Sequence, residues 1–227
     1  AWNHGQCHEA PPLAPEPRIS RPFECIGIDF MEEPQSARGN HAVLVVIDHA
    51  TKWVEAKACS DQTAETAARF VFENIICRHG APKEIWSDRG KCFMGEVMAH
   101  LSKLCGIEQR FTSGYHPQTN GLTERMNRTI NEMLAKAVAD NQRNWDDLLP
   151  ALVWSYNTSK QSATGYSPFE LNHGHAPVLP LDAKLQDDSV PLRASEWVRT
   201  LGEQVKMLQN ANLANQKKAA AAQAAQY

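Results

Sequence analysis

The sequence predicts an α/β protein: a mixed five-stranded sheet flanked by helices, followed by a C-terminal helical tail. Three strand-like segments follow one another between residues 23 and 57. Helical and strand-like segments then alternate between residues 60 and 111, and longer helical patterns come after them. Successive strands favour antiparallel pairing, whereas strands separated by helices favour parallel pairing. This order is therefore typical of a mixed sheet covered by helices.

The strands are recognised by the spacing of their apolar residues. Between residues 23 and 31, Ile26, Ile28 and Phe30 alternate with smaller or polar residues, so Asp29 is expected on the face opposite the isoleucines. Residues 41–48 (HAVLVVID) form a continuous β-branched run, as expected for a central strand buried on both faces. Residues 51–57 are expected to form a third, antiparallel strand. Residues 83–87 and 107–111 are expected to form two short strands, the first of which ends just before Asp88.

The first helix is expected between the third and fourth strands. Ser60 or Asp61 can cap it, and Gly80 with Pro82 beyond marks its end. Its apolar positions at helical spacing are Ala64, Ala68, Val71, Phe72 and Ile75.

Two further helices are expected before and after the fifth strand. Val97, Leu101 and Leu104 mark the apolar side of a helix that Gly106 closes. A long helix starts just before Glu124 and leaves this carboxylate on the side opposite its apolar stripe. The stripe consists of Leu122, Met126, Ile130, Met133, Leu134, Ala137 and Val138.

Composition limits the function classes. With 227 residues, of which 42% are hydrophobic and 22% charged, the chain is expected to form one main domain. Its formal net charge of -3 offers no bulk attraction to nucleic acid, so any phosphate binding requires a local patch. The six cysteines occur singly, which favours a reducing intracellular compartment. No apolar run approaches about eighteen residues and no signal peptide opens the chain, so neither a membrane span nor secretion is expected. Because it begins at Ala1 rather than Met, we expect it to be part of something longer.

Three carboxylates occupy settings that suit a metal site. Asp29 interrupts an apolar strand, Asp88 follows a strand, and Glu124 lies in the first turn of a helix, with thirty-five residues between it and Asp88. Carboxylates are the hard oxygen ligands that magnesium or manganese requires. Each residue also has a structural explanation: a hydrogen bond to a loop for Asp29, a turn for Asp88 and the helix dipole for Glu124. Taken singly, none of the three decides between these readings.

Five motifs around these carboxylates resemble those of a known family. IGIDFM, LVVIDHATKWVEA, WSDRGKCF, YHPQTNGLTERMNRT and WSYNTSKQSATGYSPFEL occur in this order between residues 26 and 171. Together they resemble the integrase catalytic core of gypsy-type LTR retrotransposons and retroviruses, from about Pro22 to His175. The resemblance implies a ribonuclease-H-like fold in which Asp29, Asp88 and Glu124 converge as a metal-binding triad.

The resemblance also implies an activity and partners. Two Mg²⁺ or Mn²⁺ ions held by the triad would promote in-line displacement at a phosphodiester. Water would be the attacking group when the 3′ ends of the element's DNA are trimmed, and the exposed 3′-hydroxyl when they are joined to target DNA. The expected partners are element-end DNA, target DNA and further copies of the chain, and the expected location is the nucleus.

The polar segment before Glu124 supplies candidate DNA contacts. The resemblance places Tyr115, His116 and Gln118 beside the DNA end, whereas the alternative is that this loop is only a connection. Asp48 is another aspartate that ends a strand, but in the family this position lies outside the triad. A turn or capping role is expected for it.

The helix that carries Glu124 supplies the remaining candidates. Asn127 and Arg128 share this helix, and Arg128 could meet a phosphate or pair with Glu124 or Glu132. Asn131 is the next exposed position, and the family commonly has lysine there. This departure predicts weaker binding to DNA.

The flanking regions depart further from the family. Residues 1–20 are expected to be an extended arm, the remnant of a link from a zinc module, because His4 and Cys7 are one pair and cannot hold zinc tetrahedrally. Residues 21–175 are expected to be the catalytic core, and residues 176–227 a linker and a helical, alanine-rich tail in place of a DNA-binding module.

Three functions remain open from sequence. The first is an integrase catalytic core that joins DNA strands, which an intact triad favours. The second is a host-adopted or degenerate integrase-like protein that binds nucleic acid or protein, which the negative net charge, Asn131 and the missing modules favour. The third is a ribonuclease-H-like nuclease that cuts without joining, which the integrase-specific loop does not support.

Overall fold

The computed structural model describes residues 21–112, 121–138 and 142–178, together with eight positions between 203 and 221. The side chains of Leu122, Glu124 and Gln142 and all of residues 1–20 lie outside this description. Within the described part of the chain, no helix is long and apolar enough to cross a membrane.

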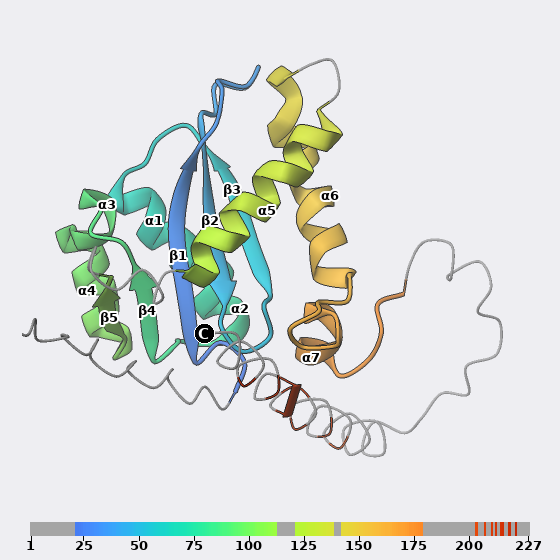
Figure 1. The fold of residues 1–227 in the computed structure, drawn as a ribbon. Coiled ribbons are helices and arrows are strands. Elements are labelled where there is room, and N and C mark those ends of the chain that lie inside the picture. The colour runs from blue at the N-terminus through green and yellow to red at the C-terminus, as the bar shows by residue number, and fades with distance from the viewer. Residues whose placement is uncertain are drawn as a thin grey trace, which may run out of the picture.

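The sheet is mixed and has five strands in the order β3-β2-β1-β4-β5, which confirms the predicted fold class (Figure 1). β1 pairs antiparallel with β2 and parallel with β4, β3 lies antiparallel to β2, and β5 lies parallel to β4. Every residue of β2 is buried, as expected for a strand covered on both faces. The strand bounds are Cys25–Glu32 (β1), Ala42–Asp48 (β2), Val54–Cys59 (β3), Glu84–Ser87 (β4) and Glu108–Phe111 (β5).

Helices cover both faces of the sheet, and each face has its own apolar core. On one face, Ile26 and Ile28 of β1 pack with residues of α1, η1, α3 and α4. On the other face, Met31 of β1 and Val43 and Val45 of β2 pack with residues of α5 and α6. In Figure 1, α5 crosses the sheet and α6 lies beside it. The helix bounds are Ala64–Phe70 (α1), Val71–Ile76 (η1, π-helical), Cys77–His79 (α2), Lys91–Met94 (α3), Glu96–Cys105 (α4), Gly121–Ala137 (α5), Gln142–Asn144 (η2), Trp145–Thr158 (α6) and Pro168–His173 (α7).

The first helix differs from its sequence prediction at its start and in its middle. Its N-cap is Thr63, whose side chain accepts a hydrogen bond from the Thr66 backbone N–H, so the prediction of a Ser60 or Asp61 cap is wrong. Asp61 instead accepts hydrogen bonds from the Thr63 and Thr66 side chains. The π-helical segment η1 widens the turn, and Phe72 is 49% exposed rather than part of the core. The predicted end is confirmed, because Gly80 follows the last turn with φ 90°.

The helix α4 ends at Gly106 as predicted, with Gly106 in the left-handed region at φ 67°. The buried side of α4 is not the side predicted from the spacing of its apolar residues. Val97 is 43% and Leu104 is 85% exposed, while Met98 and Ser102 are buried. Leu101 is only partly buried against the core. The 3-4 spacing therefore predicted the helix but not the face that contacts the sheet.

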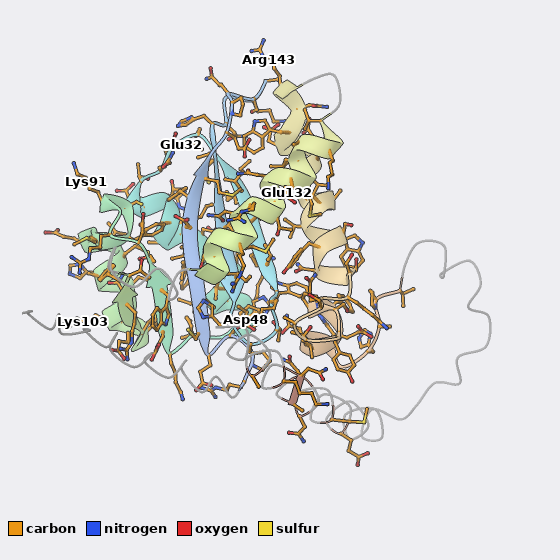
Figure 2. The ribbon with its side chains drawn as sticks, in the orientation of Figure 1. Glu32, Asp48, Lys91, Lys103, Glu132 and Arg143 are labelled. Atoms are coloured by element: carbon orange, nitrogen blue, oxygen red, sulfur yellow. The ribbon has the colours of Figure 1, made fainter. Side chains whose placement is uncertain are left out.

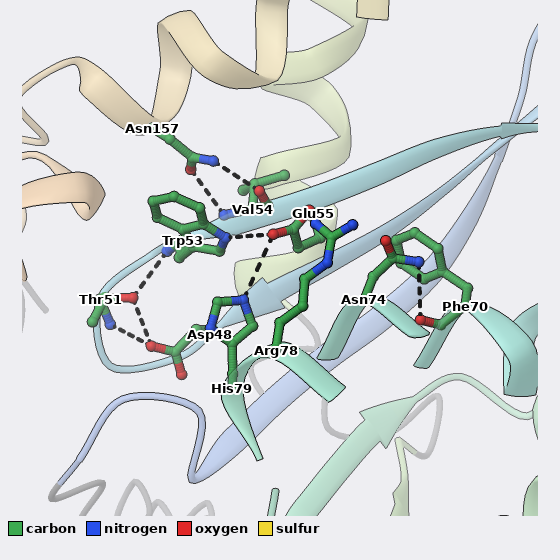
Figure 3. Close-up of polar contacts among 10 residues, drawn as sticks. All are labelled: Asp48, Thr51, Trp53, Val54, Glu55, Phe70, Asn74, Arg78, His79 and Asn157. Carbon is green, nitrogen blue, oxygen red and sulfur yellow. Dashed lines mark hydrogen bonds and ion pairs between the residues drawn. The ribbon is translucent and has the colours of Figure 1, made fainter. Parts of the chain in front are cut away.

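The helix α6 is attached to β3 through an asparagine (Figure 3). The Val54 backbone N–H donates to Asn157 Oδ1 at 2.9 Å, and Asn157 Nδ2 donates to the Val54 carbonyl at 2.8 Å. The side chain thus satisfies both backbone groups of one residue of the outermost strand. Asn157 is 3% exposed, so these two hydrogen bonds are shielded from water.

The described tail positions between 203 and 221 are all helical, in agreement with the predicted helical tail. Two of them contact the core. Asn212, which is 6% exposed, donates to the Ala50 carbonyl at 3.1 Å, and Asn215 donates to the Thr164 carbonyl at 2.8 Å.

Candidate active site

Asp29 lies on β1, on the face of the sheet that α5 covers. Strand alternation puts Ile26 and Ile28 into the opposite core, as the sequence predicted. The half-buried carboxylate accepts the backbone N–H of Phe30 at Oδ1 (2.9 Å) and the side-chain amide of Asn127 at Oδ2 (2.7 Å). Asp29 is therefore oriented from two sides.

Asp88 follows directly after β4, the parallel neighbour of β1. The aligned pairs Cys25↔Glu84, Ile26↔Ile85 and Gly27↔Trp86 all join residues 59 apart. The same offset continued by two residues brings Asp88 opposite Asp29, and neighbouring strands lie about 4.8 Å apart. The Asp88 carboxylate is exposed and accepts the Gly90 backbone N–H at 2.8 Å, so it also fills the turn role that its setting predicts.

Partial burial raises the pKa of the Cys92 thiol, and the negative charges of Asp88 and Asp29 both raise it further. A Cβ built on Gly90 would lie 2.9 Å from Asp88 Oδ1 and 3.4 Å from Cys92 Sγ, so a larger residue there would crowd the carboxylate. The electrostatics thus agree with the strand register in bringing Asp29 and Asp88 to the same neighbourhood.

The start of α5 approaches β1 very closely. A Cβ built on Gly27 would lie only 2.2 Å from Thr123 Oγ1, so only glycine fits this approach. Gly27 precedes Asp29 by two residues and shares its face of the sheet. Thr123 precedes Glu124, and Asn127 is one turn further along α5. The backbone of position 124 therefore lies between a residue packed on Gly27 and a residue bonded to Asp29.

Glu124 is in the first turn of α5, as predicted, but its side chain lies outside the described residues. Among the described residues, no group of three or more His, Cys, Asp or Glu side chains could hold a metal ion. The donors that are described, two carboxylates on neighbouring strands, have the hard oxygen character that magnesium and manganese require. The convergence of all three carboxylates stays a prediction.

The predicted DNA contacts lie in different places. Asn127 is half-buried and bonded to Asp29, which makes it a partner of the carboxylate in this state. Arg128 and Asn131 are exposed on α5, and within the described residues Arg128 forms no ion pair with Glu132. Tyr115, His116 and Gln118 lie outside the described residues.

Asp48 has the structural role that was expected of it. It is fully buried and accepts hydrogen bonds from the Phe23 backbone N–H (3.0 Å) and from the backbone (2.8 Å) and hydroxyl (2.7 Å) of Thr51 (Figure 3). Burial raises the pKa of Asp48, whereas these hydrogen bonds lower it. Asp48 therefore holds the loop after β2.

Sequence reasoning missed the contact of Gly27 with Thr123 and the hydrogen bond from Asn127 to Asp29. A glycine inside a strand is a signal of close backbone approach, and it was available in the sequence. The Asn127 contact had no such signal, because it joins residues 98 positions apart.

Comparison with known proteins agrees with this fold. Residues 19–117 match the family described as Integrase core domain. The chain is 31% identical over 209 residues to the Tf2-3 and Tf2-4 transposon polyproteins of Schizosaccharomyces pombe, a match that covers 91% of this chain and 16% of each polyprotein. The chain thus spans about a sixth of the length of these curated relatives.

Three solved retroviral structures have a similar fold. The simian T-cell lymphotropic virus intasome in complex with a PP2A regulatory subunit has a TM-score of 0.61 at 21% identity, covering 78% of this chain and 62% of that chain. The catalytic core domain of BIV integrase has a TM-score of 0.54 at 22% identity (66% and 93% covered). The catalytic core domain of HTLV-2 integrase, solved with magnesium in a trimeric form, has a TM-score of 0.55 at 20% identity (67% and 98% covered).

The five-stranded mixed sheet with helices on both faces has the ribonuclease-H-like fold. This is the fold class that the sequence predicted. The family match, the retrotransposon relatives and the retroviral structures together support an LTR retrotransposon or retroviral integrase catalytic core.

Proposed function

We propose that this chain is the catalytic part of an integrase that trims the 3′ ends of an element's DNA and joins them to target DNA. The parallel register of β1 and β4, whose offset of 59 residues would set Asp88 opposite Asp29 if continued by two residues, is the observation that supports it most directly. The proposed partners are element-end DNA, target DNA and further copies of the chain, acting in the nucleus. The proposed parent element is of the gypsy type.

Three carboxylates would hold the metal ions. Asp29 and Asp88 provide oxygen ligands from β1 and β4, and Glu124 provides a third from α5. When bound, two magnesium or manganese ions would activate the attacking oxygen and offset the charge on the leaving oxygen. Asn127 fixes the orientation of Asp29 by donating to its Oδ2.

The exposed side of α5 would position the DNA. Arg128 can donate to a phosphate, and Asn131 can donate from its amide, although it carries no charge. In the reaction, a water or a 3′-hydroxyl attacks phosphorus on one side while the bond to the leaving oxygen breaks on the other. The loop residues Tyr115, His116 and Gln118 are proposed to hold the DNA end.

The proposal is tested with a labelled duplex that carries the terminal sequence of the parent element, a supercoiled plasmid as target, and Mg²⁺ or Mn²⁺. Asp88→Asn and Glu124→Gln should abolish both trimming and joining. Glu132→Gln is the matched control, because Glu132 is an exposed carboxylate two turns further along α5 and should leave both reactions intact (Figure 2). Activity of Glu124→Gln equal to that of the unaltered chain would contradict the catalytic proposal.

A host-adopted or degenerate protein that binds nucleic acid or protein is the second candidate, and Asn131, which is uncharged where the family commonly has lysine, favours it over DNA joining. The same experiment separates the possibilities. Metal-independent DNA binding without trimming or joining supports a binding module, whereas trimming without any joined product supports a nuclease.

A further inference from the structure

The outer side of α4 carries an exposed apolar stripe. Val97 and Leu104 are 43% and 85% exposed, and Leu101 lies between them, one helical turn from each. Met94, just before α4, is also exposed, at 56%. Most exposed apolar residues in proteins are scattered singly, whereas these three exposed residues lie along one short stretch, with the half-buried Leu101 among them.

A row of charged residues runs beside this stripe. Glu96, His100 and Lys103 are spaced by four and three residues, so they share one side of α4, and all three are exposed. Glu96 is in the first turn and Lys103 in the last, which places opposite charges at the two ends of the row. Lys103 lies on the outer side of the helix, away from the sheet (Figure 2). Within the described part of the chain, neither charge has an ion-pair partner.

We propose that the stripe on α4 is a contact surface for a second copy of this chain, with the two α4 helices antiparallel about a twofold axis. In that arrangement each stripe packs against its copy, and Leu104 packs near Val97 of the other chain. A twofold axis perpendicular to the helices keeps both charged rows on the same side and reverses their direction. Glu96 of one chain then lies opposite Lys103 of the other, twice per dimer, and the two helix dipoles oppose each other favourably. The surface is thus complementary to itself in both shape and charge.

The contact leaves the candidate active site accessible. α4 packs on the sheet face that holds Ile26 and Ile28, whereas Asp29 lies on the face covered by α5. A ten-residue helix is about 15 Å long. A contact made by this helix alone is small compared with standard interfaces, which bury about 800 Å² per partner. We therefore expect a weak association.

Sedimentation equilibrium of the full chain over a concentration series tests the proposal, independently of any catalytic assay. Leu104→Glu should raise the dimer dissociation constant by at least about tenfold. The matched control is Val178→Glu, an exposed apolar residue (52%) outside α4, which should leave the constant unchanged. Circular dichroism should show that both variants stay folded, since neither side chain is buried.

A charge exchange tests the orientation. Glu96→Lys and Lys103→Glu should each weaken the dimer several-fold, because each sets like charges opposite each other. The double variant should restore the constant of the unaltered chain. The proposal is overturned if the unaltered chain stays monomeric at about 100 μM, if Leu104→Glu dimerises normally, or if the double variant is weaker than either single one.

Discussion

The contact between Gly27 and Thr123 makes a sharp prediction for Gly27→Ala. The new Cβ would lie 2.2 Å from Thr123 Oγ1, about 0.8 Å inside the closest distance that real Cβ contacts show. His49 Nε2 at 3.1 Å and Ile47 Cγ2 at 3.4 Å leave no room for a sideways shift. α5 must therefore move outward, and overpacking of this size costs about 1–3 kcal/mol of the free energy of unfolding.

The same movement should affect catalysis. Thr123 lies directly before Glu124, so an outward shift of α5 would separate position 124 from Asp29. A displacement of about 1 Å can reduce a reaction rate by about 100-fold. We therefore expect Gly27→Ala to lose both stability in urea, followed by tryptophan fluorescence, and joining activity with the element-end duplex.

Thr123→Ala supplies the compensating change. Its hydroxyl oxygen is buried without a hydrogen-bond partner among the described residues, so its removal alone should cost less than about 1 kcal/mol. Combined with Gly27→Ala, it should recover most of the lost stability, with a coupling energy of about 1–2 kcal/mol. If Gly27→Ala unfolds at the same urea concentration as the unaltered chain, or if Thr123→Ala gives no recovery, α5 does not pack on β1 as described.

Three further outcomes are expected. Asn157→Ala leaves the Val54 backbone N–H and carbonyl without their partner and should cost about 2–3 kcal/mol in urea unfolding. Ser155→Ala, at an exposed position of the same helix, should cost under about 0.5 kcal/mol. Burial lowers the pKa of His49 from 6.5 to about 4. Between these pH values the imidazole binds a proton in the unfolded chain but not in the folded chain. The contribution of neutral His49 to the free energy of unfolding is thus complete above pH 6.5 and is lost as the pH decreases toward 4. His49→Gln should reduce this pH dependence by up to about 3 kcal/mol. An unchanged dependence of stability on pH would contradict the assignment. Asp88→Asn should raise the melting temperature without metal, because it removes a like charge beside Asp29, and should reduce the stabilisation by MnCl₂; equal metal stabilisation of both chains would argue against a site there.

Local patterns predicted local geometry well. The alternation around Asp29 predicted its face correctly because side chains of a strand alternate strictly between two faces. Gly80 and Gly106 predicted helix ends because each adopts a positive φ that other residues avoid. The chain offers several polar residues before the first helix, however, and only the backbone conformation selects Thr63 as the cap.

Relations between distant segments could not be predicted in the same way. The spacing of α4 fits two apolar sides, one through Val97 and Leu104 and one through Met98, and only the position of the sheet decides which is buried. The proximity of Asp88 to Asp29 depends on the strand order, which places β4 beside β1 although 59 residues separate their paired positions. Family resemblance supplied that relation, whereas spacing alone did not.

The order of the strands gives the sheet two edges with different protection against aggregation. At one edge, α6 covers β3, and Asn157 occupies backbone groups with which another chain could otherwise pair. At the other, β5 has a single neighbour among the described strands and is largely exposed. Its protection against pairing with another chain is electrostatic and comes from Glu108 and Arg110, whose Oε1 and Nη2 atoms lie 3.0 Å apart. Salt screens such charges, so concentrated salt should favour aggregation through β5 while β3 stays protected.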